Sequence, residues 1–166
     1  MKKVILLMLI ATLGIASANA QFEKGVKRIK AQTSAFDLNF SKDDFNLNLG
    51  LEGSYFIVNN LAVHANVGFD WHDTKNKAAD KWESWHKVGF GIGADYYFYK
   101  MFYGGIGFDF SKTKNIDFES AIKLKIGATY YISQNVYVNP DIYFNSGLGS
   151  DSTARFGLEM GIGVNF

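Results

Sequence analysis

The side chains best suited to chemistry in this chain are three histidines, at positions 64, 72 and 86. Imidazole can act as a general base beside a nucleophile, or as a metal ligand. No serine stands two residues after any of them, and His72 beside Asp73 has no serine obviously placed with it. The histidines are dispersed and the chain has no cysteine, so the sequence gives only weak support for a metal site. We therefore expect no catalytic, cofactor-binding or metal-binding residues.

Charged side chains are the second group that could act together, and their spacing shows which element must carry them. In RFGLEMGIGVNF, residues 155–166, apolar residues alternate strictly with glycine and polar residues. Such alternation is typical of a strand with one apolar and one polar face. We expect an interior charge network on the polar face, with a stabilising role or, as an alternative, a proton or ion route. Its predicted members are Glu52, Asp70, Asp95, Asp109, Lys123, Lys125, Asp141, Arg155 and Glu159.

Eight segments show this alternation, and most have about ten residues, the length of a tilted strand that crosses a membrane. They are expected at residues 36–40, 45–57, 61–71, 88–98, 102–110, 122–132, 136–144 and 156–166. Pro140 lies inside the seventh strand, where it must remove a ladder hydrogen bond or mark a bulge. Inward-facing glycines are expected to leave room for the charged side chains.

The connections between these strands are predicted to alternate between short and long. Three similar stretches, SYFIVNNLAV, DYYFYKMFYG and TYYISQNVYV, each leave a gap of three residues between two apolar-face positions. Such gaps fit three-residue hairpin loops, and Asn60 and Asn135 suit a left-handed final position. The other connections are longer and polar, at residues 41–44, 72–86, 111–117 and 145–155. Short turns at one end and longer loops at the other are typical of transmembrane β-barrels.

The start of the chain is interpreted as a secretory signal peptide of residues 1–20, cleaved after Ala20. A positive MKK start is followed by an apolar run and a small-x-small ANA ending. Residues 21–30 are then expected to be a solvated periplasmic arm, and residues 31–166 the barrel. No later apolar run approaches the roughly 18 residues of a membrane helix, so strands would have to cross a membrane. The net charge of +1 argues against a nucleic-acid partner.

Aromatic residues on the apolar face are expected to mark the two boundaries of a membrane. A ring with an apolar body and a polar tip is most stable at the membrane–water interface. Tyrosines stand two residues before each short turn, and we expect an interfacial girdle formed by Tyr55, Tyr96 and Tyr130. A second girdle is expected near the opposite strand ends, from Trp71, Trp82 and Trp85.

This layout resembles the small outer-membrane barrels of the OmpX and OmpA-transmembrane-domain type, over roughly residues 30–166. The expected fold is all-β, an eight-stranded antiparallel up-and-down transmembrane β-barrel. The resemblance implies the outer membrane of a Gram-negative bacterium, with outer-membrane lipids and lipopolysaccharide as partners. It also implies that Phe166, which ends an apolar-faced strand, is an assembly signal for the barrel assembly machinery.

The expected function is a structural or surface-interaction role in the cell envelope, without catalysis. One alternative is a barrel enzyme that acts on lipid A or phospholipid. Lipid A deacylases of similar shape carry a His-x-Ser arrangement on one strand, and this chain has none. The other alternative is a narrow channel, although eight strands enclose a space that side chains just fill.

Overall fold

The computed structural model describes residues 22–34, 44–76, 81–113, 118–149 and 154–166. The expected signal peptide lies outside these residues and stays a prediction. Within the described part of the chain, no helix is long and apolar enough to cross a membrane.

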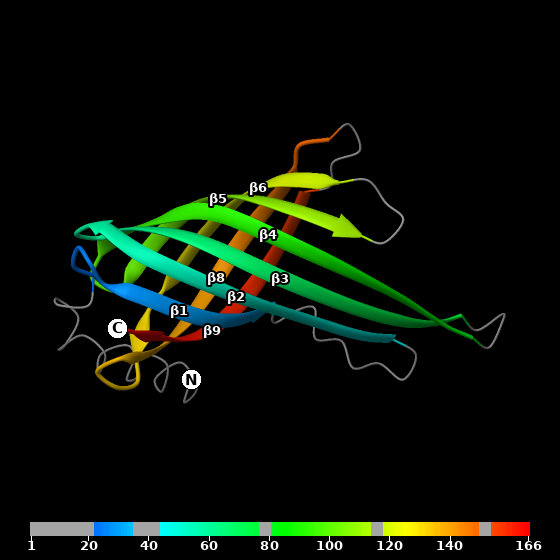
Figure 1. The fold of residues 1–166 in the computed structure, drawn as a ribbon, viewed down its shortest axis with the longest axis horizontal. Helices are drawn as coiled ribbons and strands as arrows, with labels where there is room; N and C mark the ends of the chain where they lie inside the picture. Colours follow the sequence, from blue (N-terminus) through cyan, green and yellow to red (C-terminus); the bar gives the residue numbers. More distant parts are fainter. Residues whose placement is uncertain (1–21, 35–43, 77–80, 114–117, 150–153) are drawn as a thin grey trace, which may run out of the picture.

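The described residues form a closed barrel of antiparallel strands, each paired with its neighbours in sequence (Figure 1). β6 and β7 are one strand interrupted at Thr129, since both pair with β8, so the wall has eight strands. The predicted fold class is confirmed. The strands are β1 (Lys27–Ser34), β2 (Asp44–Val58), β3 (Leu61–Asn76), β4 (Lys81–Tyr99), β5 (Phe102–Thr113), β6 (Glu119–Ala128), β7 (Tyr130–Tyr131), β8 (Val136–Gly147) and β9 (Ala154–Asn165).

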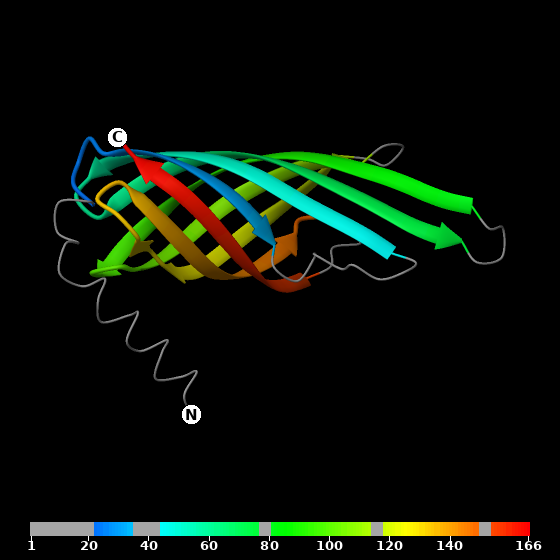
Figure 2. The same cartoon turned by 90° about the horizontal axis from the view of Figure 1, so that it is seen from below.

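The barrel closes through β1, which pairs with β2 on one side and with β9 on the other. The start of β1 and the end of β9 lie at the same end of the barrel (Figure 2). There the Lys27 amide donates to the Phe166 carbonyl at 3.1 Å, and the Phe166 amide donates back to Lys27 at 3.0 Å. The ring of strand pairings is therefore complete.

The first strand lies earlier in the chain than predicted, and the predicted boundary between arm and barrel is wrong. β1 begins at Lys27, so part of the expected arm at 21–30 is barrel wall. Arg28 and Lys30 are buried inside rather than solvated, and Ile29 between them is exposed on the outer face. The strand predicted at 36–40 lies outside the described residues.

The two faces of the wall have opposite chemistry. Leu49, Ile126 and Met160 point outward, and 52%, 65% and 55% of their surface is exposed. Inward-pointing Lys30 and Asp141 are each only 3% exposed. Successive residues of a strand face opposite sides of its sheet. The predicted alternation therefore separates an apolar exterior from a charged interior.

Short turns at one end join β2 to β3 and β4 to β5, and each contains two residues next to a bulge. Val58 pairs with Leu61, and the β2–β3 register shifts between Phe56 and Val58. The β4–β5 hairpin repeats this arrangement, because Tyr99 pairs with Phe102 after a shift. A bulge adds one residue to one strand. Each hairpin therefore has a two-residue turn and one bulge residue in place of the predicted three-residue loop.

The left-handed backbone positions at this end differ in part from the prediction. Asn60, the second residue of its turn, has φ of 67°, as expected, whereas in the β4–β5 turn the first residue, Lys100, has positive φ, of 44°. Asn135 is not among the described residues with positive φ, so that prediction is wrong. The third turn instead closes through the Ile132 and Ser133 amides, which both donate to the Val136 carbonyl.

The β3–β4 hairpin is longer than predicted. β3 has 16 residues and β4 has 19, and the two strands pair out to Asn76 and Lys81. Most of the connection predicted at 72–86 is therefore strand. β5 reaches only to Thr113, opposite Lys87. The outer part of the hairpin consequently projects past the other strands, at the end opposite the short turns (Figure 1).

Pro140 explains the interruption between β6 and β7. The register places it opposite Ala128. The amide of the next residue, Thr129, donates away from β8 to the Met101 carbonyl at 2.9 Å. The Ala128 backbone therefore faces β8, where proline has no N–H to offer. The Asn139 side-chain amide donates to the Ala128 carbonyl instead, at 3.3 Å. Pro140 thus removes a ladder hydrogen bond, one of the two predicted effects.

Candidate functional site

The polar interior of the barrel is the candidate functional site, because buried charged groups from most strands converge there. The buried charged and imidazole side chains of the described residues are Arg28, Lys30, Glu52, His64, Asp95, Lys125, Asp141 and Glu159. They come from β1, β2, β3, β4, β6, β8 and β9. A group of charges from seven strand segments can form only when the sheet has closed.

Inward glycines on neighbouring strands make room for these long side chains. A Cβ atom added to Gly161 would lie 2.6 Å from Lys30 Cδ, and one added to Gly105 would lie 2.7 Å from Lys125 Cε. A Cβ on Gly93 would lie 2.5 Å from His64 Nε2. These distances are shorter than non-bonded carbon contacts allow. The glycines therefore serve as the space into which charged side chains extend.

Two ammonium groups bridge three carboxylates in the centre of the network. Lys30 Nζ lies 3.2 Å from Glu52 Oε1 and 4.0 Å from Asp141 Oδ2. Lys125 Nζ lies 3.5 Å from Glu52 Oε2 and 3.1 Å from Asp95 Oδ2. Buried charges are costly unless they are paired and hydrogen-bonded. Each ammonium group here offsets the desolvation of two carboxylates at once.

Further hydrogen bonds join the centre to the rest of the wall. Lys123 Nζ donates to Glu159 Oε2 at 2.6 Å. The Tyr103 hydroxyl donates to Asp141 and accepts from Asn139 Nδ2, the latter at 3.2 Å. Asn139 also donates to the Thr129 hydroxyl at 3.0 Å. A network with these partners fixes side-chain positions across the barrel.

Arg28 lies between the network and the short-turn end, inside a cage of aromatic rings. Its guanidinium nitrogens donate to the Tyr97 and Tyr131 hydroxyls, each at 2.6 Å. Its Cζ atom lies 4.6 Å from the Phe56 ring centroid and 5.0 Å from that of Tyr137. Contacts of a cation with ring faces at this distance are attractive. The cage thus accommodates a buried cation in addition to the ion pairs.

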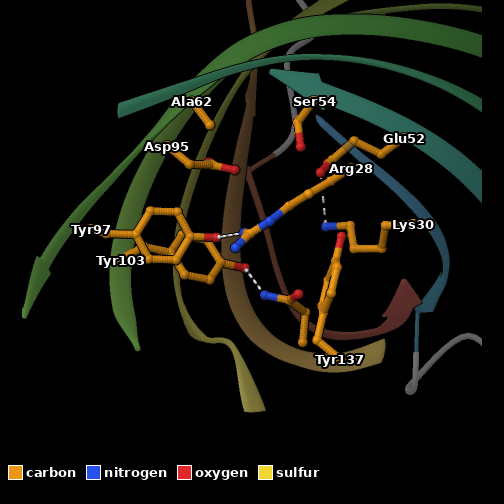
Figure 3. A pocket seen from close by; sticks show the side chains of 10 residues that line it. Arg28, Lys30, Glu52, Ser54, Ala62, Asp95, Tyr97, Tyr103 and Tyr137 are labelled. Atoms are coloured by element: carbon orange, nitrogen blue, oxygen red, sulfur yellow. Dashed lines mark hydrogen bonds and ion pairs between the residues drawn. The ribbon is translucent and has the colours of Figure 1, made fainter. Parts of the chain in front are cut away.

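Figure 3 shows this part of the interior from close by. Arg28 points toward Tyr97, Lys30 contacts Glu52, and Tyr103 and Tyr137 border the same small cavity. Charged groups, hydroxyls and an amide dominate its lining. The cavity is part of the network and has the chemistry of a water-sized polar gap.

His64 is the histidine that the structure brings into this network. Its Nδ1 atom lies 3.3 Å from Asp95 Oδ2, so an acid orients the imidazole. Ser54 is opposite His64 in the β2–β3 register. The other nitrogen, Nε2, lies over Gly93 on β4, on the side away from β2. The imidazole is therefore not directed at a serine nucleophile, and the base–nucleophile contact of a hydrolase is missing from this pair.

Glu52, His64 and Asp95 also offer ligand atoms within 4.8 Å of one another. Lys125 lies 3.1 Å and 3.5 Å from carboxylate oxygens of Asp95 and Glu52. A metal ion would have to displace this ammonium group from both carboxylates. The arrangement is that of an ion-pair network, and we assign no metal to it.

The predicted members of the charge network are placed in three ways. Glu52, Asp95, Lys125, Asp141 and Glu159 are buried in the interior, and Lys123 is paired there with Glu159. Asp70 accepts a hydrogen bond from Asn48, and Asp109 is half-buried. Arg155, at the start of β9, lies opposite inward Asn145, and its side chain is exposed rather than buried. It lies at the end opposite the short turns, where side chains reach solvent.

Sequence reasoning missed Arg28, Lys30 and His64 as members of the network. The signal for His64 was present, because its neighbours Val63 and Ala65 face outward and are exposed. Arg28 and Lys30 lay in a segment interpreted as a solvated arm. The alternation Arg28, Ile29, Lys30, Ala31 could have identified this segment as a strand.

The residues predicted at the boundaries lie on the outer surface or the chain end. Tyr55 and Tyr96 are 41% and 55% exposed, and Tyr130 is half-buried. Trp71 is 42% exposed at the far end of the apolar band, and Phe166 is 65% exposed beyond β9. The side chains of Trp82 and Trp85 lie outside the described part of the structure.

Comparison with known proteins places the fold among small bacterial barrels. No protein-family model and no curated protein sequence matches the chain. A similar solved structure is the N-terminal β-barrel domain of OprF from Pseudomonas aeruginosa, with a TM-score of 0.58 and 14% identity over 86% of this chain and 98% of that one. The outer membrane protein Ail of Yersinia pestis has a TM-score of 0.58 and 12% identity over 86% of this chain and 100% of that one. Neisserial surface protein A has a TM-score of 0.58 and 13% identity over 85% of this chain and 96% of that one.

Proposed function

We propose that this chain is an integral outer-membrane β-barrel with a structural or surface-interaction role and no catalytic activity. The observation that carries the proposal is the distribution of burial. Isoleucine, leucine and valine side chains are exposed around the barrel, while lysines and carboxylates are buried within it. A water-soluble barrel would have the opposite arrangement, because exposed apolar surface is unfavourable in water.

The height of the apolar surface fits a bilayer. Tyr55 pairs with Val63, and eight residues further along β2 Leu47 pairs with Trp71. Eight steps of roughly 3.4 Å, tilted by roughly 40°, span roughly 21 Å, close to the roughly 25 Å apolar band of outer-membrane barrels. Tyr55 and Trp71 would then lie near the two membrane interfaces, where such rings are favoured.

The outer membrane is the proposed location for three reasons. A closed barrel with an apolar exterior satisfies its backbone without lipid-exposed strand edges. The expected signal peptide would direct export from the cytoplasm, and the similar solved structures include an outer-membrane protein of Yersinia pestis. In the usual orientation the short turns face the periplasm and the projecting β3–β4 hairpin faces outward. The proposed lipid partners are therefore outer-membrane lipids and lipopolysaccharide.

Cell fractionation tests the proposed location. The chain should appear in the outer-membrane fraction, and its first tryptic peptide should begin at Gln21. Folded barrels resist the denaturing detergent of the gel, so the unboiled sample should migrate faster than the boiled one. Folded protein in the soluble periplasmic fraction would contradict the proposal.

Lipid analysis tests the absence of catalysis. The network keeps its buried histidine beside Asp95 and directs Nε2 away from Ser54. Mass-spectrometric profiles of lipid A and phospholipid should therefore be identical in cells with and without the protein. A lipid species that appears only with the unaltered protein, and not with His64→Ala, would favour the enzyme alternative.

Phe166 is proposed as the residue that the barrel assembly machinery recognises. The backbone of Phe166 is bonded to Lys27, and its side chain is exposed, so its ring adds little internal packing. Phe166→Ala should lower the amount of assembled barrel in cells and leave the stability of purified, folded molecules nearly unchanged. Unchanged yield in cells would remove this role from Phe166.

A further inference from the structure

The first described residues, 22–26, cover the mouth of the barrel at the short-turn end. Phe22 precedes β1, yet its side chain is only 4% exposed. It belongs to one buried cluster with Phe56, Ala62 and Tyr97. Its ring centroid lies 4.3 Å from that of Tyr97 and 6.0 Å from that of Phe56. A residue outside the strands therefore completes the packing at this end.

Backbone hydrogen bonds hold this segment on the β2–β3 hairpin. The Asn60 amide donates to the Phe22 carbonyl at 2.8 Å, and the Lys24 amide donates to Asn59 Oδ1 at 2.9 Å. The Gly25 amide donates to the Phe56 carbonyl at 2.9 Å. Gly25 has φ of +98°, which favours glycine. This turn lets the chain cross the mouth before β1 begins.

Arg28 connects the covering segment to the interior. Its Cζ atom lies 4.9 Å from the Phe22 ring centroid, while its nitrogens hold the Tyr97 and Tyr131 hydroxyls. The Phe22 ring thus packs against the same Arg28 side chain that lines the polar cavity together with Ala62 and Tyr97 (Figure 3).

We propose that residues 22–26 are a fixed cover, seated by Phe22, that closes this mouth and keeps water and ions from entering the polar interior there. The proposal concerns a function of the N-terminal segment beyond the envelope role. It holds for either orientation in the membrane, because both the cover and the cavity belong to the folded barrel.

Single cysteines provide the test, since the chain has none of its own. Ala62, 1% exposed beneath the cover, is replaced by Cys in one variant, and exposed Ser133 on the third turn is replaced by Cys in another. Both are made with and without Phe22→Ala, extracted from membranes in detergent, and shown to be folded by the gel shift. The measurement is the rate of reaction with a positively charged methanethiosulfonate reagent.

With Phe22 present, Ala62→Cys should react far more slowly than Ser133→Cys. Adding Phe22→Ala should raise the Ala62→Cys rate by about tenfold or more, since each tenfold corresponds to about 1.4 kcal/mol of opening free energy. The Ser133→Cys rate should not change. If Phe22→Ala leaves the reaction rate of Ala62→Cys unchanged, the proposal is overturned. If the Phe22→Ala chain does not fold, equal rates for Ala62→Cys and Ser133→Cys in the otherwise unchanged chain would also overturn it.

Discussion

Lys125 shows how single residues make a charged interior tolerable. Its ammonium group lies between Glu52 and Asp95, at 3.5 Å and 3.1 Å, and glycine at position 105 leaves room for its methylene chain. Removing one partner of a buried ion pair leaves the other charge without compensation, which costs far more than the net value of the pair. The interior therefore depends on complete sets of partners rather than on individual bonds.

Lys125→Met should lower the free energy of unfolding in micelles by about 3–5 kcal/mol, because Glu52 and Asp95 would lose a shared cation. Lys112→Met is the matched control, since Lys112 is exposed at the loop end of β5, and its effect should stay within about 0.5 kcal/mol. Asp95→Asn added to Lys125→Met should recover part of the loss. Denaturant titration measures all three, and equal effects of the two lysine substitutions would contradict the network.

The direction in which single side chains point can be tested on β8. Ile142 points outward and is 51% exposed, whereas inward Asn145 pairs with Lys123 and Arg155 on the neighbouring strands. Ile142→Asp should cost about 1–3 kcal/mol, less than a cation at the same depth. Asn145→Asp adds a carboxylate beside two cations and should be nearly neutral. Equal damage in micelles would show that the register is wrong.

Among the strands, β8 is joined to the interrupted strand β6–β7 by a side-chain hydrogen bond next to Pro140. Pro140 cannot donate to Ala128, and the Asn139 side chain does so instead. Asn139→Ala should cost about 1–3 kcal/mol, because the Ala128 carbonyl and the Thr129 hydroxyl lose a donor. Pro140→Ala should be more favourable in the Asn139→Ala chain than in the unaltered chain, since residue 140 then supplies an N–H. A double-mutant cycle without coupling would refute this account.

The eight-strand pattern could be read from the sequence wherever the outward residues are strongly apolar. β9 and β4 alternate with isoleucine, phenylalanine and valine, so their faces were clear. β1 was missed because its outward side offers only Ile29 and Ala31, and its charges resemble a solvated arm. The stretch at 36–40 has a stronger alternation. Local apolar content favoured the later segment, whereas pairing with β2 and β9 selects β1.

The interior site was likewise predictable only on strands that the sequence pattern identified. Inward positions of recognised strands were predictable, and Glu52, Asp95 and Asp141 lie in the interior. Their partners were not, because Lys30 lies on the unrecognised β1. The nine predicted members include six carboxylates and three cations, so the sequence suggested an excess of negative charge. Arg28 and Lys30 reduce that excess, and Lys30 lies opposite Glu52 only because β1 pairs with β2.

The extension of the β3–β4 hairpin also escaped prediction. Residues 72–86 are rich in polar and charged side chains, which are typical of loops. The two strands nevertheless pair continuously to Asn76 and Lys81. Beyond the bilayer a hairpin needs no apolar face, so the alternation that identifies membrane strands disappears while backbone pairing continues.

The molecule as a whole is defined by its apolar exterior and its charged interior. The strands present apolar side chains outward, and their buried ion pairs lie inside. The two surfaces have exchanged the places they hold in water-soluble proteins. The molecule should therefore need an apolar medium to fold, whatever its role in the envelope.

Refolding of the unmutated chain with and without detergent micelles tests whether its apolar exterior requires lipid. Chain beginning at Gln21 is diluted from urea into micelles or into plain buffer, and circular dichroism, gel migration and light scattering are recorded. In micelles we expect a β-rich species that migrates faster before boiling than after, and in plain buffer we expect aggregation. A monodisperse, β-rich protein in plain buffer would contradict the membrane assignment.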